Sequence, residues 1–148
     1  MEKILLAVDG SDHSMRAAAM AGELSRHFDA PVTVINVVPE ARMAMPAEIQ
    51  EYAQLEHVYL TQRDLMRSAG SDIVARAAAQ VAEAGGQVGA QDVEIGTPAP
   101  SIATRADAMG ADCIVMGRRG LGDIKGLFMG SVSHRVGQLS DKTLVTTE

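Results

Sequence analysis

A glycine-rich segment is the part of this sequence whose residue types and spacing are best suited to binding chemistry. Residues 116–133 read Met-Gly-Arg-Arg-Gly-Leu-Gly-Asp-Ile-Lys-Gly-Leu-Phe-Met-Gly-Ser-Val-Ser, with five glycines in the fourteen positions from 117 to 130. Ordering a glycine costs conformational entropy, so such a run is useful where the main chain approaches a ligand or adopts a positive φ. The segment leaves an apolar run and enters a predicted helix, whose unpaired N–H groups and positive dipole end would bind an anion.

The polar side chains of this segment favour phosphate as that anion. Ser131 and Ser133 lie in the first turn of the predicted helix, where their hydroxyls can donate hydrogen bonds to a phosphate. One of Arg118, Arg119 and Lys125 is expected to contact the phosphate as well, and the residues themselves do not decide which. The alternative for the whole segment is a flexible surface loop with ordinary solvated charges.

The sequence does not support nucleophilic catalysis, a structural metal site or another type of nucleotide-binding loop. Ser131 and His134 share a helix face, but no Gly-x-Ser-x-Gly elbow and no orienting carboxylate accompany them, so we predict no catalytic residue. The histidines lack ligand spacing and Cys113 is the only cysteine, so we expect no structural metal, and Mg²⁺ would be held through the phosphates. A P-loop is excluded because no Walker motif is present. A dinucleotide-binding fingerprint is not expected either, because its glycines should follow the first strand and these follow the fourth.

Apolar runs alternate with helical patterns and predict the element order β-α-β-α-β-α-β-α-β. Strands are expected at Ile4–Val8, Val32–Val38, Val88–Ile95, Asp112–Met116 and Thr143–Thr147. Helices are expected from Ser11 or Asp12 to about Phe28, over roughly Ala47–Ala84, from Pro98 or Pro100 to Gly110, and from about Gly130 to Leu139. Gly70-Ser71 is expected to break or kink the second helix, because both residues disfavour a helix interior.

This alternation predicts one α/β domain over residues 1–148, with an open parallel sheet and helices on both faces. Ligands bind such sheets at the carboxyl ends of the strands, where the strand order reverses. If the fourth strand lies beside the first, the glycine-rich segment faces Ala7, Val8 and Asp9. Asp9 could then accept a hydrogen bond from an adenine amino group or a ribose hydroxyl, with the alternative that it is a helix cap or turn residue. The backbone near Val37 could line the base.

Composition and charge narrow the class of protein. Apolar residues make up 47% of the chain and aromatic residues only 3%, which suits an aliphatic parallel sheet covered by alanine-rich helices. The formal net charge of −6 argues against a nucleic acid as partner, because phosphate backbones require a basic face. The apolar run after Lys3 is too short for a signal peptide or a membrane span, so we expect a cytoplasmic protein without membrane insertion.

The sequence resembles the ATP-binding members of the universal stress protein family. The spacing Gly117-x2-Gly120-x9-Gly130-Ser131 matches that family's ATP-binding signature, and the resemblance extends over the chain through Ile4–Ser11, Val34–Val38 and Gly110–Gly117. It implies a Rossmann-like, adenine nucleotide α-hydrolase-like sheet of five strands in the order 3-2-1-4-5, and frequent homodimers. The chain's short, threonine-rich last strand departs from the longer apolar ending of members that dimerise through it.

By position, the resemblance implies which residues would form an ATP site. Phosphates would be held by Gly117, Gly120, Gly130 and Ser131, with Arg119, Val132 and Ser133 nearby. Adenine and ribose would be surrounded by Ala7, Val8, Asp9 and Val37, and Met116 at the end of the fourth strand completes the set.

Three functions follow from this reading. The first is a regulatory module that binds ATP and is read by an unidentified protein partner. The second is a slow ATP hydrolase or nucleotidyl transferase, which lacks a visible base. The third is a family member that binds no nucleotide and works through protein–protein interaction. The role of the Met43–Met45 segment stays open between packing and contact with a partner.

Overall fold

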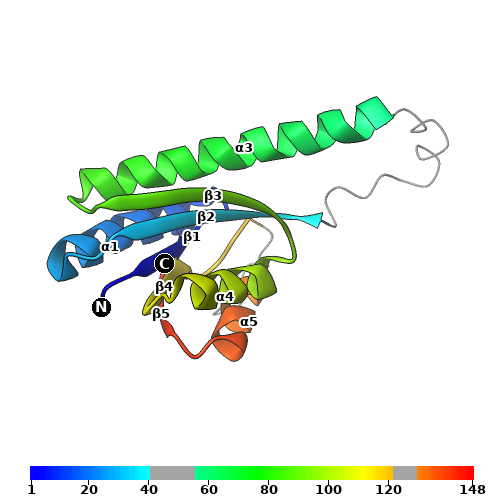
Figure 1. Cartoon of the computed structure of the whole chain (residues 1–148). Coiled ribbons are helices and arrows are strands. Elements are labelled where there is room, and N and C mark those ends of the chain that lie inside the picture. The colour runs from blue at the N-terminus through cyan, green and yellow to red at the C-terminus, as the bar shows by residue number, and fades with distance from the viewer. Residues whose placement is uncertain (41–55, 122–129) are drawn as a thin grey trace.

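The computed structural model describes residues 1–40, 56–121 and 130–148, which form a single five-stranded sheet flanked by helices (Figure 1). Every neighbouring pair of strands is parallel, and the strand order is β3-β2-β1-β4-β5, as predicted. The strands are β1 (Ile4–Ala7), β2 (Val32–Pro39), β3 (Val88–Gly96), β4 (Cys113–Gly117) and β5 (Thr143–Thr147). The order reverses between β1 and β4, so a crevice forms where these two strands end.

Burial explains why the strand segments differ in composition. The three central strands are buried along nearly their whole length, and a strand covered on both faces must be apolar throughout. β3 and β5 form the two edges and are half-exposed, which accounts for the polar residues Gln91 and Asp92 within β3. The predicted strand at Val88–Ile95 is confirmed and extends to Gly96.

Helices cover both faces of the sheet, as predicted. Helices α1 (Asp12–Phe28) and α3 (Glu56–Glu83) pack on one face of the sheet, and α4 (Pro98–Met109) and α5 (Ser131–Leu139) pack on the other. Local signals set the ends: the Ser11 hydroxyl caps α1 by accepting from the Ser14 N–H at 3.2 Å, and Gly110 ends α4 with a φ of 65°.

The predicted break at Gly70-Ser71 is wrong, because α3 is continuous through both residues. A Cβ added at Gly70 would lie 2.7 Å from Val93 Cγ1 and 2.8 Å from Asn36 Oδ1. Gly70 therefore serves the close approach of α3 to the sheet, at the cost of some helix propensity. The first part of the predicted helix, residues 47–55, and the segment with Met43 and Met45 lie outside the described residues.

Two neighbouring side chains at the start of β4 have shifted pKa values, for different reasons. The Asp112 carboxylate accepts from the N–H groups of Glu2 and Lys3 at 2.6 and 3.1 Å, and these bonds hold its pKa below the ordinary range. The next residue, Cys113, is fully buried, and burial raises the pKa of its thiol. Cys113 is thus a core residue whose reactive thiolate form is disfavoured.

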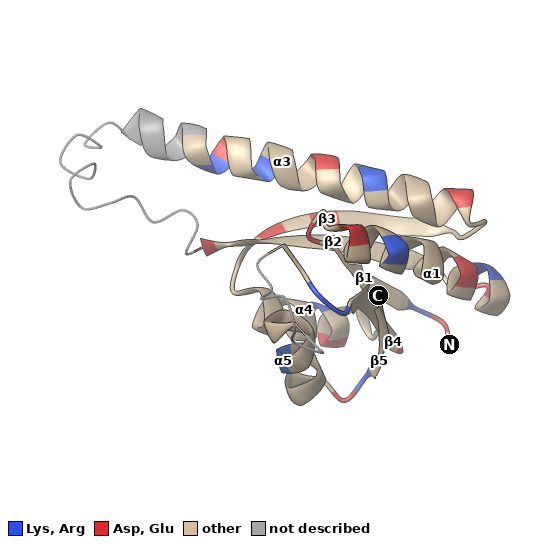
Figure 2. Cartoon of the chain, turned by 180° about the vertical axis from the view of Figure 1, so that it is seen from behind, with Lys and Arg blue, Asp and Glu red and all other residues tan. Residues whose placement is uncertain are grey.

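Charges of both signs are interspersed along α1 and α3, as Figure 2 shows for one side of the molecule. Within the three described ranges, no helix is long and apolar enough to cross a membrane.

Replacing Gly70 with alanine should lower the stability of the protein, although alanine is the better helix former. Alanine gains about 1 kcal/mol of helix propensity, but forcing a methyl group into this contact costs about 1–3 kcal/mol, so we expect a net loss of up to about 2 kcal/mol. Urea unfolding followed by circular dichroism measures the change. Ser71→Ala, an exposed neighbour in the same helix, is the control and should be slightly stabilising. A Gly70→Ala variant as stable as Ser71→Ala would contradict the packing explanation.

Candidate functional site

A cavity of about 300 Å³ opens at the carboxyl ends of β1, β2 and β4. All twelve residues that the sequence nominated for a nucleotide site line this one cavity, although their role in binding a ligand stays a prediction. They come from the strand ends and from the glycine-rich segment together with the start of α5: Ala7, Val8, Asp9, Val37, Met116, Gly117, Arg119, Gly120, Gly130, Ser131, Val132 and Ser133. Residues 122–129, which include Lys125, lie outside the described part of the chain.

The N-terminus of α5 presents open main-chain donors to this cavity. Its N-cap is Gly130, which has no side chain to accept from the helix, and the first intrahelical bond joins the His134 N–H to the Gly130 carbonyl at 3.0 Å. No acceptor among the described residues pairs with the N–H groups of Ser131, Val132 and Ser133. Three unpaired amides at the positive end of a helix form an arrangement suited to an anion.

The two serines of this helix turn have different roles. Ser133 is 2% exposed, and its hydroxyl donates to the main-chain carbonyls of Arg118 and Gly130 at 2.8 and 3.1 Å. Its hydroxyl therefore holds the glycine-rich segment to the helix, and the phosphate contact expected of it stays a prediction. Ser131 is exposed at the cavity, so its hydroxyl remains accessible there.

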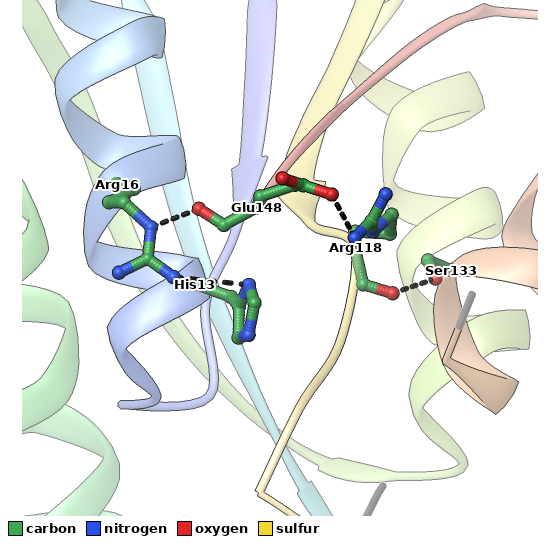
Figure 3. A network of polar contacts seen from close by, with 5 residues as sticks. All are labelled: His13, Arg16, Arg118, Ser133 and Glu148. Atoms are coloured by element: carbon green, nitrogen blue, oxygen red, sulfur yellow. Dashed lines mark hydrogen bonds and ion pairs between the residues drawn. The ribbon is translucent and has the colours of Figure 1, made fainter. Parts of the chain in front are cut away.

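The two adjacent arginines make different contacts in the structure, which bears on the open question of which one would meet a phosphate. Arg118 forms an ion pair with the Glu148 carboxylate, and the Glu148 carbonyl in turn accepts from Arg16 (Figure 3). Arg16 also lies 3.2 Å from Nδ1 of His13, so this network holds the start of α1 beside the residues that follow β4 and β5. Arg119 instead lines the cavity. Of the two, Arg119 is the one positioned to meet an anion bound there.

Asp9 connects the end of β1 to the glycine-rich segment. Its Oδ1 accepts from the Ser11 N–H at 3.0 Å, and its Oδ2 accepts from the Leu121 N–H at 2.9 Å. A Cβ at Gly120 would lie 2.5 Å from that Oδ2, so only glycine leaves room for the second contact. The turn role considered for Asp9 is present, and each oxygen keeps a second lone pair that a ligand donor could use.

A glycine at position 117 is required by packing against α1, a reason that the sequence analysis did not predict. A Cβ there would lie 2.9 Å from main-chain atoms of His13 and Ser14, at the start of α1. The absence of a side chain thus allows β4 and α1 to approach, and a substitution at Gly117 would displace α1 as well as disturb the cavity.

Sequence reasoning missed the second wall of the cavity. This wall comes from the end of β2 and from one face of α3, and includes Asn36, Val38, Met66, Ala69, Gly70 and Ile73. The four α3 residues are spaced i, i+3, i+4 and i+7, which marks one face of a helix. The same spacing is typical of a buried core face, so the sequence alone could not assign these residues to a cavity.

The described residues contain no cluster of three or more histidine, cysteine or carboxylate side chains that could hold a metal ion.

Comparison with known structures shows universal stress proteins of the same fold, two of which are in complex with an adenine nucleotide. The chain superposes on universal stress protein UspA from Lactobacillus plantarum with a TM-score of 0.83, at 22% identity over 99% of this chain and 97% of that one. A universal stress protein in complex with cAMP matches with a TM-score of 0.67, at 24% identity over 99% and 96% of the two chains. The universal stress protein from Archaeoglobus fulgidus in complex with dAMP matches with a TM-score of 0.64, at 21% identity over 100% and 98%.

Sequence comparison shows the family directly. The chain is 34% identical to universal stress protein YxiE of Bacillus subtilis (strain 168) over 139 residues, which are 93% of each protein. The model of the universal stress protein family matches residues 1–147. Since this match takes in both the strand ends and the helix start that build the cavity, the chain belongs to the universal stress protein family.

Proposed function

We propose that this protein binds ATP in the cavity and acts as a nucleotide-responsive regulatory module. The observation that carries the proposal is the set of three N–H groups of Ser131, Val132 and Ser133, which have no acceptor among the described residues. These three residues line a cavity whose far walls are mainly apolar. The first amides of a helix lack intrahelical partners, and where they belong to residues that line a cavity they suit an anionic ligand.

The phosphates would lie at the α5 end of the cavity. The three amides donate to phosphate oxygens there, Ser131 adds its hydroxyl, and Arg119 adds positive charge. Mg²⁺ would be held through the phosphates, in keeping with magnesium's use of substrate oxygens and water as ligands.

The adenine and ribose would lie between the ends of β1, β2 and β4 and the α3 face. Val37, Met116 and Ile73 offer apolar surface to a planar ring, and Asp9 offers carboxylate oxygens to an amino or hydroxyl group. The adenine nucleotides named for two universal stress proteins of the same fold, cAMP and dAMP, support the choice of base and leave the number of phosphates to experiment.

A binding role is favoured over rapid catalysis by the residues that line the cavity. Asp9 is the only carboxylate among its described lining residues, and both of its oxygens already accept main-chain hydrogen bonds. Phosphoryl transfer needs a group that positions the attacking water or acceptor, and none of the described lining residues is placed for that task. We therefore expect slow hydrolysis at most. A homodimer belongs to the same proposal, since β5 leaves one edge of the sheet open to a second chain.

Isothermal titration of folded, ligand-free protein with ATP and Mg²⁺ tests the proposal, and we expect saturable binding at one site per chain. Titrations with GTP, cAMP and dAMP then define the base and the number of phosphates. Single-turnover hydrolysis separates the roles: about one event per hour with ATP still bound fits a module, whereas ~1 per second, an ordinary enzyme rate, would show an enzyme. No binding of any adenine nucleotide would favour a member that works through protein contacts alone.

Ser131→Pro should weaken ATP binding because it removes one of the three amide N–H groups. Proline is well tolerated at the first position of a helix, and Gly130 already has the extended backbone that precedes a proline, with φ −70° and ψ 157°. A hydrogen bond to a charged group is worth about 1.5–3 kcal/mol, so the dissociation constant should rise by roughly 10- to 150-fold.

Ser131→Ala is the matched control, since it removes the hydroxyl and keeps the amide. It should bind ATP more tightly than Ser131→Pro, while circular dichroism and the melting temperature of the two ligand-free variants stay similar. Equal affinities in the two variants would show that the amides do not hold phosphate.

Arg119→Ala should weaken ATP binding by about 10-fold or more, from the loss of a charge-assisted contact to phosphate. Adenosine, which has no phosphate, should bind the variant almost as it binds the original protein. Arg118→Ala is the matched control, because Arg118 pairs with Glu148 rather than lining the cavity. If both variants lost ATP affinity equally, the charge of the region rather than the position of Arg119 would be responsible.

A further inference from the structure

The β1–β2 ladder stops at the cavity. Its last register pair is Ala7 with Ile35, and the Val8 N–H still donates to the Ile35 carbonyl at 2.9 Å. In a continuing parallel ladder, the next bond would run from the Val37 N–H to the Val8 carbonyl. No such bond is present, although β2 continues to pair with β3 as far as Pro39 and Gly96.

A side chain occupies the position that the missing bond would use. Nδ2 of Asn36 donates to the Val8 carbonyl at 2.7 Å, and Asn36 is only 5% exposed. The direction of the amide is fixed by chemistry, because only its NH₂ group can donate to a carbonyl. Asn36 thus satisfies a buried acceptor that would otherwise take the Val37 N–H.

Helix α3 packs closely against the Asn36 side-chain amide. Oδ1 of Asn36 lies so close to Gly70 that a Cβ there would be 2.8 Å away. The glycine in the middle of α3 therefore makes room for the Asn36 side chain, and both residues line the cavity. The unit of Val8, Asn36 and Gly70 joins β1, β2 and α3 at the base end of the proposed nucleotide site.

The end of the ladder affects the hydrogen bonding of the Val37 main chain. Its N–H and carbonyl point to the β1 side of β2, because alternate residues of a strand face alternate neighbours and Ile35 is bonded to β1. Neither group has a hydrogen-bond partner in the described parts of the chain. One donor and one acceptor, side by side on Val37, are thereby left facing the cavity that this residue lines.

We propose that Asn36 is a positioning residue that keeps the Val37 main chain available to read the base of a bound nucleotide. This inference rests on the proposed function. A neighbouring donor and acceptor match the ring nitrogen and amino group of adenine, which accept and donate, whereas guanine presents a donor and a carbonyl at the same positions. Asn36 would therefore set the preference for adenine without touching the base itself.

Asn36→Leu tests the idea, because leucine has the same branched shape and no donor. The Val8 carbonyl would then be satisfied by the Val37 N–H, which closes the ladder by one further bond. We expect the preference for ATP over GTP to fall by roughly 5- to 150-fold, the range for one paired donor and acceptor. The affinity for inorganic tripolyphosphate, which has no base, should stay the same.

Hydrogen exchange of the ligand-free proteins gives a readout that is independent of nucleotide. The Val37 amide should exchange rapidly in the original protein and become protected in Asn36→Leu, while the Ile35 amide stays protected in both. Val34→Ala, on the same strand and buried in the core, is the control for lost stability and should keep the ATP preference. Asn36→Ser provides a second variant if Asn36→Leu fails to fold, since its hydroxyl is too short to replace the amide and the ATP preference should again fall.

The outcomes separate the two proposals. An unchanged ATP preference in the Asn36 variants, or a Val37 amide that is protected in the original protein, overturns the role of Asn36 whether or not ATP binds. The predicted exchange pattern without any nucleotide binding supports the role of Asn36 in opening the ladder, and overturns both the proposed function and base reading.

Discussion

The structure depends on how main-chain hydrogen-bonding groups are satisfied where β1, β2 and β4 end together. A parallel sheet pairs these groups along its length, but at the strand ends the ladder stops and buried carbonyls and N–H groups need other partners. Here three short polar side chains supply most of them. Asp9 accepts from Ser11 and Leu121, Asn36 donates to Val8, and Ser133 donates to the carbonyl of Arg118.

The groups that these side chains leave unpaired are gathered in one place. Among the described residues, they are the main chain of Val37 and the first amides of α5, and both sets belong to residues that line the cavity. The polar side chains thus do more than stabilise the strand ends. Because they supply the hydrogen bonds that the fold needs there, nearby main-chain groups can remain available to a ligand. This division between groups used by the fold and groups left open is the physical basis of the proposed ATP site.

The sequence predicted the fold and one wall of the cavity because those features follow from local patterns. Continuous apolar runs mark the central strands, and the spacing of Gly120, Gly130 and Ser131 marks a turn that enters a helix. It could not predict the roles of Gly70 and Gly117, since both glycines are explained by segments distant in sequence that pack against them. The glycine in α3 was read as a helix breaker because propensity is local, whereas the contact with Val93 and Asn36 is not. Asn36 looked like one polar residue in an apolar strand, and its bond to Val8 became visible only with the register of β1 and β2.

The glycine-rich segment is held by contacts on two sides, and this gives the proposed module a route for a signal. On one side Asp9 holds the Leu121 N–H, and on the other the Arg118 N–H donates to the Thr147 carbonyl at 2.7 Å. Arg118 also pairs with Glu148, and the Thr147 hydroxyl donates to the His13 carbonyl at 3.0 Å, so β5 and the start of α1 meet beside this segment. Under the proposed function, ATP at a hundred times its dissociation constant would stabilise the bound arrangement by about 2.7 kcal/mol. That energy can change the population of two states only if they bind ATP differently, and β5, the open edge beside the segment, is the element where such a difference would reach a second chain.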